Sequence, residues 1–223
     1  NEYHTGTSTP RMAFSDDLLD AGAEIWEAQR DHPFVTELAD GSLDPAAFRH
    51  WIEQDYRYLL DYARLFAVAG AKARSEATMT TFLEIAHSTL TEEMDLHRSF
   101  ADDYGISRAE LELVEKAPTC RAYTDFLLRT AYEGSVAEIS AALYPCGQGF
   151  LDIGEHAAQL ATETHRYTPW IETYTSEEFR EVVASMRAVV DRHGEQYPGQ
   201  REAMRDAFLT SARLEYAFWE MAY

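Results

Sequence analysis

Apolar residues recur along this chain at the spacing of α-helices. The longest apolar stripe follows i, i+3/i+4, i+7 spacing and consists of Phe48, Trp51, Ile52, Tyr56, Leu59, Leu60, Ala63, Phe66 and Ala67. A shorter stripe near the N-terminus, interrupted by Gly22, contains Leu18, Leu19, Ile25 and Trp26. No alternating run of β-branched residues between turn signals indicates a strand. The pattern therefore predicts an all-α protein.

Capping residues and helix breakers divide this pattern into about eight helices. We expect helices to begin at Ser15–Asp17, Ser42–Pro45, Ser75, Ser107, Pro118, Val136, Thr168, Ser176 and Pro198. Expected ends lie near Arg74, Gly105, Gly134, Thr164, His193–Gly194 and Met221. Long helices without a sheet pack as a bundle, so we predict a single-domain helical bundle.

The chain divides into a short leader and one domain. Residues 1–11 are mostly polar and contain Gly6 and Pro10, which predicts a flexible N-terminal leader. Residues 12–223 contain no composition shift, linker or internal repeat. Because 223 residues can bury one sizeable core, we expect residues 12–223 to form one all-helical domain.

The formal net charge of −20 argues against several classes of partner. Such a chain repels the phosphates of nucleic acids and anionic membrane surfaces, and the sequence contains no Lys/Arg cluster. It has no apolar run long enough to span a membrane and no signal-peptide pattern. Its two cysteines cannot form a disulfide framework. We therefore expect a cytoplasmic protein that binds neither nucleic acid nor membranes.

The basic residues are skewed towards arginine, with only Lys72 and Lys116 against 17 arginines. Few lysines and an excess of Asp and Glu are what we expect of a protein kept soluble in concentrated salt, which screens charge repulsion. The alternative is an ordinary acidic protein from a GC-rich genome. Under the first interpretation the unfolding midpoint rises along a salt series, and greater stability in dilute buffer would contradict it.

Asp55 is a candidate functional carboxylate. It shares a helix face with Tyr58, and the apolar stripe brackets it, so its side chain is expected at the edge of the core or within it. A carboxylate there needs partners, because burying an unpaired charge is costly. The alternative is a structural aspartate that caps a helix or pairs with an arginine.

The segment around Cys146 combines several unusual residues. Pro145 removes a helical hydrogen bond, and Gly147 and Gly149 each weaken a helix by ~1 kcal/mol relative to alanine. A weakened turn beside a cysteine indicates a site rather than a stabilising element, because a thiolate is a strong nucleophile. The alternative is a buried structural cysteine. We expect that structural role for Cys120.

Glu215 lies on the apolar face of the last helix with Phe218 and Trp219. A carboxyl group among aromatic rings is expected to have a raised pKa, which suits general acid/base catalysis near neutral pH. Without a second functional group nearby, such a residue would more often be a paired core glutamate.

Several stretches, in this order and spacing, resemble the TenA or thiaminase II family. They are His32–Val35, Asp40–Leu43, Gln54–Leu59, Ala122–Thr124, Tyr144–Cys146, Trp170–Tyr174, Glu215 and Phe218–Trp219. The resemblance covers most of the chain, from about Leu18 to Tyr223. It implies a haem-oxygenase-like fold, a homotetramer and no metal or cofactor. It also implies cleavage of thiamin or of aminomethylpyrimidine, releasing hydroxymethylpyrimidine for thiamin salvage.

The resemblance also assigns roles to individual residues. Cys146 would be the nucleophile, and Glu215 the acid/base that takes the thiol proton and protonates the leaving group. Asp55 would bind the exocyclic amine and a ring nitrogen of the pyrimidine. The residues expected to orient the ring or pack on it are Tyr58, Tyr123, Tyr174 and Phe218.

The chain departs from the family pattern directly after the cysteine. Gly147, Gln148, Gly149 and Phe150 stand where relatives tend to have bulky aromatics and a tyrosine. Phe150 lacks the tyrosine hydroxyl, the glycines would open space, and Gln148 would add a donor and an acceptor. We therefore expect Gln148 and Phe150 to contact the substrate in a roomier or more polar pocket, in which thiamin is a poor substrate.

Two alternatives change the class of protein. The first is a haem-oxygenase-like di-iron oxidase, with candidate ligands Glu84, His87, Glu93, His97, Glu155, His156 and His165. Pairs at this spacing also occur on solvated helix faces. The second is a pyrimidine-binding regulatory protein without turnover, for which a cysteine and a glutamate held together would be unnecessary.

Overall fold

The computed structural model describes residues 12–223, so the predicted leader at residues 1–11 lies outside the described part, and the division into leader and domain stays a prediction. Within residues 12–223 the chain is helical and has no strand. The α-helices are α1 (Phe14–Ala21), α2 (Ala23–Arg30), α3 (Pro33–Asp40), α4 (Pro45–Lys72), α5 (Glu76–Ser88), α6 (Met94–Asp103), α7 (Arg108–Leu113), α8 (Pro118–Glu133), α9 (Val136–Leu160), α10 (Thr168–Tyr174), α11 (Glu177–Gln196) and α12 (Arg201–Ala222). A π-helical turn, η1 (Thr89–Glu93), joins α5 to α6, and a 3-10 turn, η2 (Pro198–Gln200), precedes α12.

The expected count of about eight helices is wrong. With α5, η1 and α6 taken as one continuous helix, the described residues form eleven. Much of the difference arises before Asp40, where α1, α2 and α3 replace one longer helix. Gly22 separates α1 from α2, and Pro33 disfavours helical backbone at His32, so α3 starts afresh with the His32 ring accepting a hydrogen bond from the Phe34 N–H.

Most of the expected helix starts are confirmed. The Asp44, Ser75, Ser107 and Ser176 side chains accept hydrogen bonds from the first turns of α4, α5, α7 and α11. Ser15 is an exception, because α1 begins at Phe14 and Ser15 lies inside it.

One expected helix end is also wrong, because α11 continues past Gly194 to Gln196. A Cβ at Gly194 would lie 2.3 Å from the Phe14 ring, so this glycine permits close packing of α1 on α11 instead of ending the helix.

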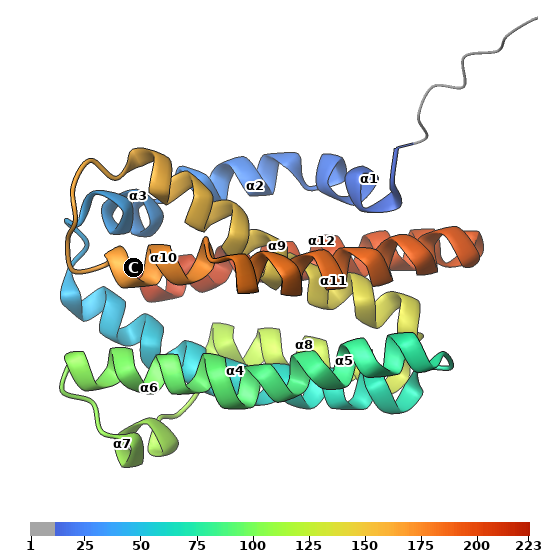
Figure 1. Ribbon diagram of the computed structural model, residues 1–223, viewed down its shortest axis with the longest axis horizontal. Helices are drawn as coiled ribbons and strands as arrows, with labels where there is room; N and C mark the ends of the chain where they lie inside the picture. Colours follow the sequence, from blue (N-terminus) through green and yellow to red (C-terminus); the bar gives the residue numbers. More distant parts are fainter. Residues whose placement is uncertain (1–11) are drawn as a thin grey trace, which may run out of the picture.

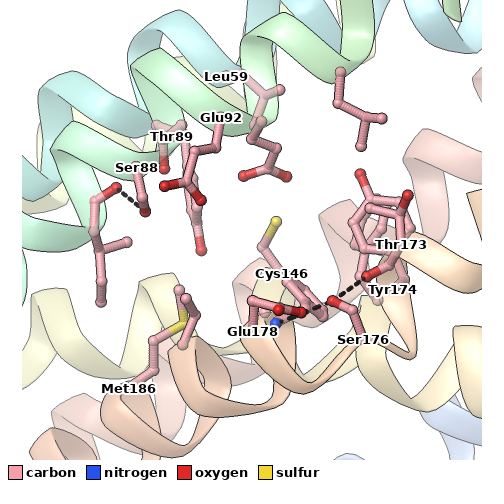
Figure 2. Close-up of a pocket in the computed structure, with 18 of the residues that line it drawn as sticks. Leu59, Ser88, Thr89, Glu92, Cys146, Thr173, Tyr174, Ser176, Glu178 and Met186 are labelled. Atoms are coloured by element: carbon pink, nitrogen blue, oxygen red, sulfur yellow. Dashed lines mark hydrogen bonds between the residues drawn. The ribbon is translucent and has the colours of Figure 1, made fainter.

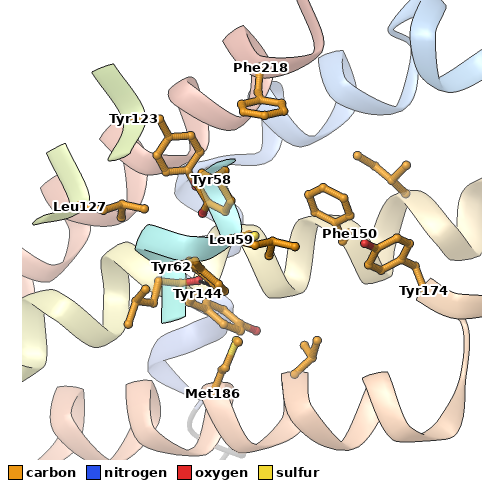
Figure 3. Packing of buried hydrophobic residues seen from close by; sticks show 14 of the residues in the cluster. Tyr58, Leu59, Tyr62, Tyr123, Leu127, Tyr144, Phe150, Tyr174, Met186 and Phe218 are labelled. Atoms are coloured by element: carbon orange, nitrogen blue, oxygen red, sulfur yellow. Dashed lines mark hydrogen bonds between the residues drawn. The ribbon is translucent and has the colours of Figure 1, made fainter. Parts of the chain in front are cut away.

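The long helix α9 occupies the middle of the bundle (Figure 1). It packs against α12 and α11 along its length and also contacts α10, α3 and α8. On the other side, α4 packs against α5, α6 and α8. The two groups of helices meet around a buried core rich in aromatic rings, part of which is formed by Tyr58, Tyr62, Tyr123, Phe150 and Phe218 (Figure 3). This arrangement places the residues around Cys146 between α4, α9 and α12.

No helix within residues 12–223 is both long enough and apolar enough to cross a bilayer.

Candidate active site

A cavity of about 160 Å³ lies between α4, α5–η1–α6, α9, α10 and α11. Its wall includes Asp55 of α4, Glu93 of η1, Cys146 and Phe150 of α9, and Tyr174 of α10. Figure 2 shows the Cys146 sulfur pointing into this space, with Glu92 and Thr89 on one side and Tyr174 and Thr173 on the other. The cavity therefore brings together side chains from distant parts of the chain around one thiol.

The position of Cys146 is fixed by side-chain bonds to the preceding turn of α9. Pro145 stands inside α9 and has no N–H for the i−4 carbonyl. Close to it, the Ala142 carbonyl accepts a hydrogen bond from Ser211 Oγ at 2.7 Å, and the Leu143 carbonyl accepts one from the Tyr62 hydroxyl at 2.9 Å. These bonds tie the proline turn to α12 and α4, so the thiol is held by three helices.

The Cys146 thiol has a pKa well above that of an ordinary cysteine. Burial is the largest cause, followed by the negative charges of Glu215 and Asp55, which oppose a thiolate. The resting side chain is therefore a protonated thiol, and it needs a base before it can act as a nucleophile. Cys120 is also buried, with a pKa of about 12 raised by burial, but it is not part of the cavity wall and contacts the Gln54 carbonyl.

Glu215 has the properties required of that base. Its side chain is 3 % exposed on α12 and accepts a hydrogen bond of 2.6 Å from the Tyr123 hydroxyl. Its pKa is raised to about 7 as the net result of burial, which raises it most, the Tyr123 and Cys146 hydrogen bonds, which lower it, and the charge of Asp55, which raises it. Near neutral pH this carboxyl group can both take and return a proton.

Asp55 is held by a histidine from the continuous helix α5–η1–α6. Its Oδ2 lies 2.5 Å from His97 Nε2, and His97 Nδ1 donates to the Glu93 carbonyl at 2.8 Å. Burial lowers the His97 pKa, but the hydrogen bond and charge of Asp55 raise it by more than burial lowers it, so the net shift is upwards. Because the carbonyl fixes a proton on Nδ1, the second proton is shared between Nε2 and Asp55.

Glu93 is a second carboxyl group in the cavity wall with a shifted pKa. This pKa is raised to about 7 as the net result of burial, which raises it most, the charge of His97, which lowers it, and the charge of Asp55, which raises it. Glu93 ends the π-helical turn, a rare feature that occurs frequently at functional sites. The sequence indicated Glu93 and His97 only as possible metal ligands, and only their i, i+4 spacing could have linked them to the site.

The predicted aromatic residues fall into two layers. Phe150 and Tyr174 line the cavity with their ring centroids 4.9 Å apart, while Tyr58, Tyr123 and Phe218 are buried beside one another. Among the described residues, the hydroxyls of Tyr58 and Tyr174 are buried without a hydrogen-bond partner. Buried polar groups are nearly always paired, so the unpaired hydroxyl of Tyr174 in the cavity wall favours a polar ligand, whereas Tyr58 is not part of that wall and its hydroxyl lies near the Cys146 thiol.

Of the residues that depart from the family pattern, Gly147 and Phe150 line the cavity and Gln148 and Gly149 do not. Gln148 is absent from the cavity wall and accepts a hydrogen bond of 3.0 Å from the Tyr144 hydroxyl. A Cβ at Gly147 would lie 2.5 Å from Met186 Sδ, and one at Gly149 would meet Trp26. Gly147, itself part of the cavity wall, therefore allows Met186 of α11 to approach α9 closely, whereas Gly149 has only an ordinary contact with Trp26, and the roomier pocket stays a prediction.

The candidate ligands of the di-iron alternative do not converge. Both ring nitrogens of His97 are engaged by Asp55 and Glu93, Glu155 pairs with Arg180, and His165 Nε2 bonds to the Ala39 carbonyl. Residues 12–223 contain no group of three His, Cys, Asp or Glu side chains placed to hold a metal ion. The structure thus gives this alternative no support.

The fold and the site together describe an all-helical protein with a buried cysteine and a nearby carboxyl group in the core of its bundle. The chain belongs to the TENA/THI-4/PQQC family, whose family model matches residues 19–223. It is 40% identical over 215 residues to the aminopyrimidine aminohydrolase of Halalkalibacterium halodurans, covering 95% of this chain and 96% of that protein.

Solved structures agree with this membership. A TenA family transcription regulator from Silicibacter sp. TM1040 superimposes with a TM-score of 0.90 at 29% identity, covering 96% of this chain and 97% of that one. A domain of unknown function with a haem-oxygenase-like fold from Shewanella denitrificans gives a TM-score of 0.73 at 11% identity, covering 95% and 92%. The second comparison confirms the haem-oxygenase-like fold.

Proposed function

We propose that this chain is an aminopyrimidine aminohydrolase of the thiaminase II type, which acts in thiamin salvage. The name of the Halalkalibacterium relative, similar over nearly the whole chain, supports this reaction. The observation that carries the proposal is the protonated Cys146 thiol in the cavity wall together with Glu215, which is not part of that wall but lies within hydrogen-bonding reach of the thiol and has a pKa of about 7. A pair of this kind serves covalent catalysis and has no use in simple binding.

The reaction proceeds by attack of Cys146 on the pyrimidine ring. Glu215 takes the thiol proton as the sulfur–carbon bond forms, and then gives that proton to the departing amine as the carbon–nitrogen bond breaks. Water adds to the exocyclic carbon, losing a proton, and the thiol leaves the ring and regains one. The net change replaces an amino group by a hydroxyl and releases ammonia.

Asp55 and the tyrosines bind the ring in this proposal. The proton shared with His97 lets Asp55 accept hydrogen bonds from the exocyclic amine and the ring while its position stays fixed. The unpaired hydroxyls of Tyr58 and Tyr174 supply further polar contacts, and Phe150 and Phe218 give apolar surface for the ring faces. Tyr123 keeps Glu215 in place through its 2.6 Å hydrogen bond. The homotetramer expected from the resemblance remains part of the proposal.

Cavity size makes a prediction about substrate preference. A cavity of about 160 Å³ matches one six-membered ring, since an engineered apolar cavity of ~150 Å³ holds benzene. We expect a higher kcat/KM for aminomethylpyrimidine than for thiamin, whose second ring extends beyond this space. The measurement is product release from both substrates in high salt, with and without a metal chelator. Faster thiamin cleavage would contradict the preference, inhibition by the chelator would revive the metal alternative, and tight binding without turnover would favour a regulatory role.

A further inference from the structure

A second cavity of about 420 Å³ lies at the end of the bundle where three helix junctions meet. Its wall is formed by the junction between α4 and α5, the start of α9, and the last turns of α11. Helices α5 and α11 also line the active-site cavity, to which they contribute Ile85 and Met186. A ligand in the second cavity would therefore contact α5 and α11, two of the helices that line the active-site cavity.

Basic side chains line this second cavity, although the chain as a whole is strongly acidic. Lys72, Arg74 and Arg192 line it, and its wall includes no Asp or Glu. Within residues 12–223, none of these three side chains forms an ion pair. In a protein with 39 acidic and 19 basic residues, two arginines without an acidic partner in one cavity wall favour an anionic ligand there.

Several donors around the cavity are held in fixed positions. Arg192 Nη1 donates to the Oγ1 of Thr78, a buried side chain, at 2.9 Å, which orients the rest of the guanidinium. Lys72 Nζ donates to the Ala131, Tyr132 and Gly134 carbonyls, so all three of its N–H donors serve the end of α8 and only Arg74 and Arg192 can pair with a ligand. His193 is 8 % exposed, and its Nδ1 bonds to the Val189 carbonyl. His193 is part of the cavity wall, and within residues 12–223 its ring forms a hydrogen bond only through Nδ1.

The first turn of α9 adds backbone donors to the same space. Ser135 caps this helix of 25 residues through the Glu138 N–H, and the Glu138 carboxylate accepts a hydrogen bond from the Ser135 N–H in return, while Val136 and Ala137 line the cavity with their own N–H groups still available. The N–H groups of the first helical residues have no intrahelical acceptor, and the helix dipole favours an anion near them. Guanidinium groups and helix amides together form the usual environment of a bound phosphate.

We propose that this cavity binds a small phosphate monoester. The phosphate would lie between Arg192, Arg74 and the start of α9, and the organic part would fill the remaining space. The volume of this second cavity is more than twice that of the active-site cavity. A bare phosphate ion would therefore leave most of it empty. The exposed ring of Tyr197 at the wall offers a surface for the organic group.

The test is calorimetric titration with phenyl phosphate and with inorganic phosphate, at an ionic strength held constant with chloride. We expect saturable binding of one phenyl phosphate per chain and weaker binding of inorganic phosphate. Arg192→Gln should weaken the affinity at least ~10-fold, because a charge-assisted hydrogen bond is lost. Arg129→Gln, which removes an exposed arginine paired with Glu133 on α8, is the matched control and should bind as the wild type does.

Three results would overturn the proposal. These are no saturable binding in the presence of chloride, equal affinities for Arg192→Gln and Arg129→Gln, or inorganic phosphate binding as tightly as phenyl phosphate. If Arg192→Gln fails to fold, Arg74→Gln decides the matter, since Arg74 is exposed and forms no ion pair within the described residues. Loss of binding in Arg74→Gln supports the site, and unchanged binding contradicts it. Binding is measured without turnover, so the outcome is independent of the proposed catalytic function.

Discussion

Replacing Cys146 by serine is expected to lower kcat/KM for aminomethylpyrimidine by on the order of 10³-fold or more. Serine has nearly the same size, so the cavity keeps its shape. A hydroxyl is a much weaker nucleophile than a thiol, and Glu215, with a pKa of about 7, is too weak a base to ionise it. Because the change affects bond formation and not the ring contacts, substrate affinity should change little. Steady-state kinetics and calorimetric titration measure the two quantities separately.

Cys120→Ser is the matched control for this experiment. It makes the same atomic change at a buried cysteine that is not part of the cavity wall. We expect its kcat/KM to remain near that of the wild type, although the loss of buried sulfur could lower its stability. Comparable turnover in Cys146→Ser and the wild type would rule out Cys146 as the nucleophile. Loss of turnover together with loss of binding would indicate that the thiol has a structural role.

Replacing Glu215 by glutamine is expected to lower kcat/KM by ~10²–10⁴-fold and to change its pH dependence. In the wild type the carboxylate is the active base, and its pKa is about 7. The rate should therefore fall as the pH decreases through 7, because the protonated acid cannot take the thiol proton. Glutamine keeps the shape but does not titrate, so the residual activity of Glu215→Gln should lose this acidic limb. The measurement is kcat/KM from pH 5 to 9 for both proteins.

Glu93→Gln provides the control for this pH assignment. Glu93 lines the same cavity and also has a pKa of about 7, so it titrates in the same range as Glu215. If Glu215 is the base, Glu93→Gln retains the acidic limb of the profile. Disappearance of that limb in Glu93→Gln, with its retention in Glu215→Gln, would transfer the role of base to Glu93. The pair of variants thus separates two carboxyl groups that a single pH profile cannot distinguish.

Local signals in the sequence predict much of the fold. Capping side chains such as Ser75 and Ser107 act within three residues, and the structure confirms them. The N-terminal part is harder to predict, because Gly22 and Pro33 mark possible breaks locally, but whether a helix continues through them also depends on how α1, α2 and α3 pack over α9 and α12. The close approach of Gly194 to Phe14 is likewise a tertiary contact with no local signal.

The candidate site shows the same division between local and long-range information. Cys146 and Phe150 are four residues apart on α9, and helical spacing places both on the cavity side. The same rule puts Gln148 about 200° away from Cys146, so its orientation could have been predicted from the sequence. The bond between Asp55 and His97 joins residues 42 positions apart on different helices. Its existence depends on the π-helical turn, for which the sequence carries no recognised pattern.

The π-helical turn η1 changes the helical register between α5 and α6. One residue accommodated as a π-turn rotates everything after it by about 100° relative to an uninterrupted α-helix. The residues of α6 therefore lie on helix faces rotated relative to those expected from α5, and this rotation directs His97 at Asp55. A single-residue deletion between Thr89 and Glu93 would give a more regular helix, yet it would turn His97 away from the cavity. Over evolutionary time, then, this segment should accept many substitutions more readily than a change in length.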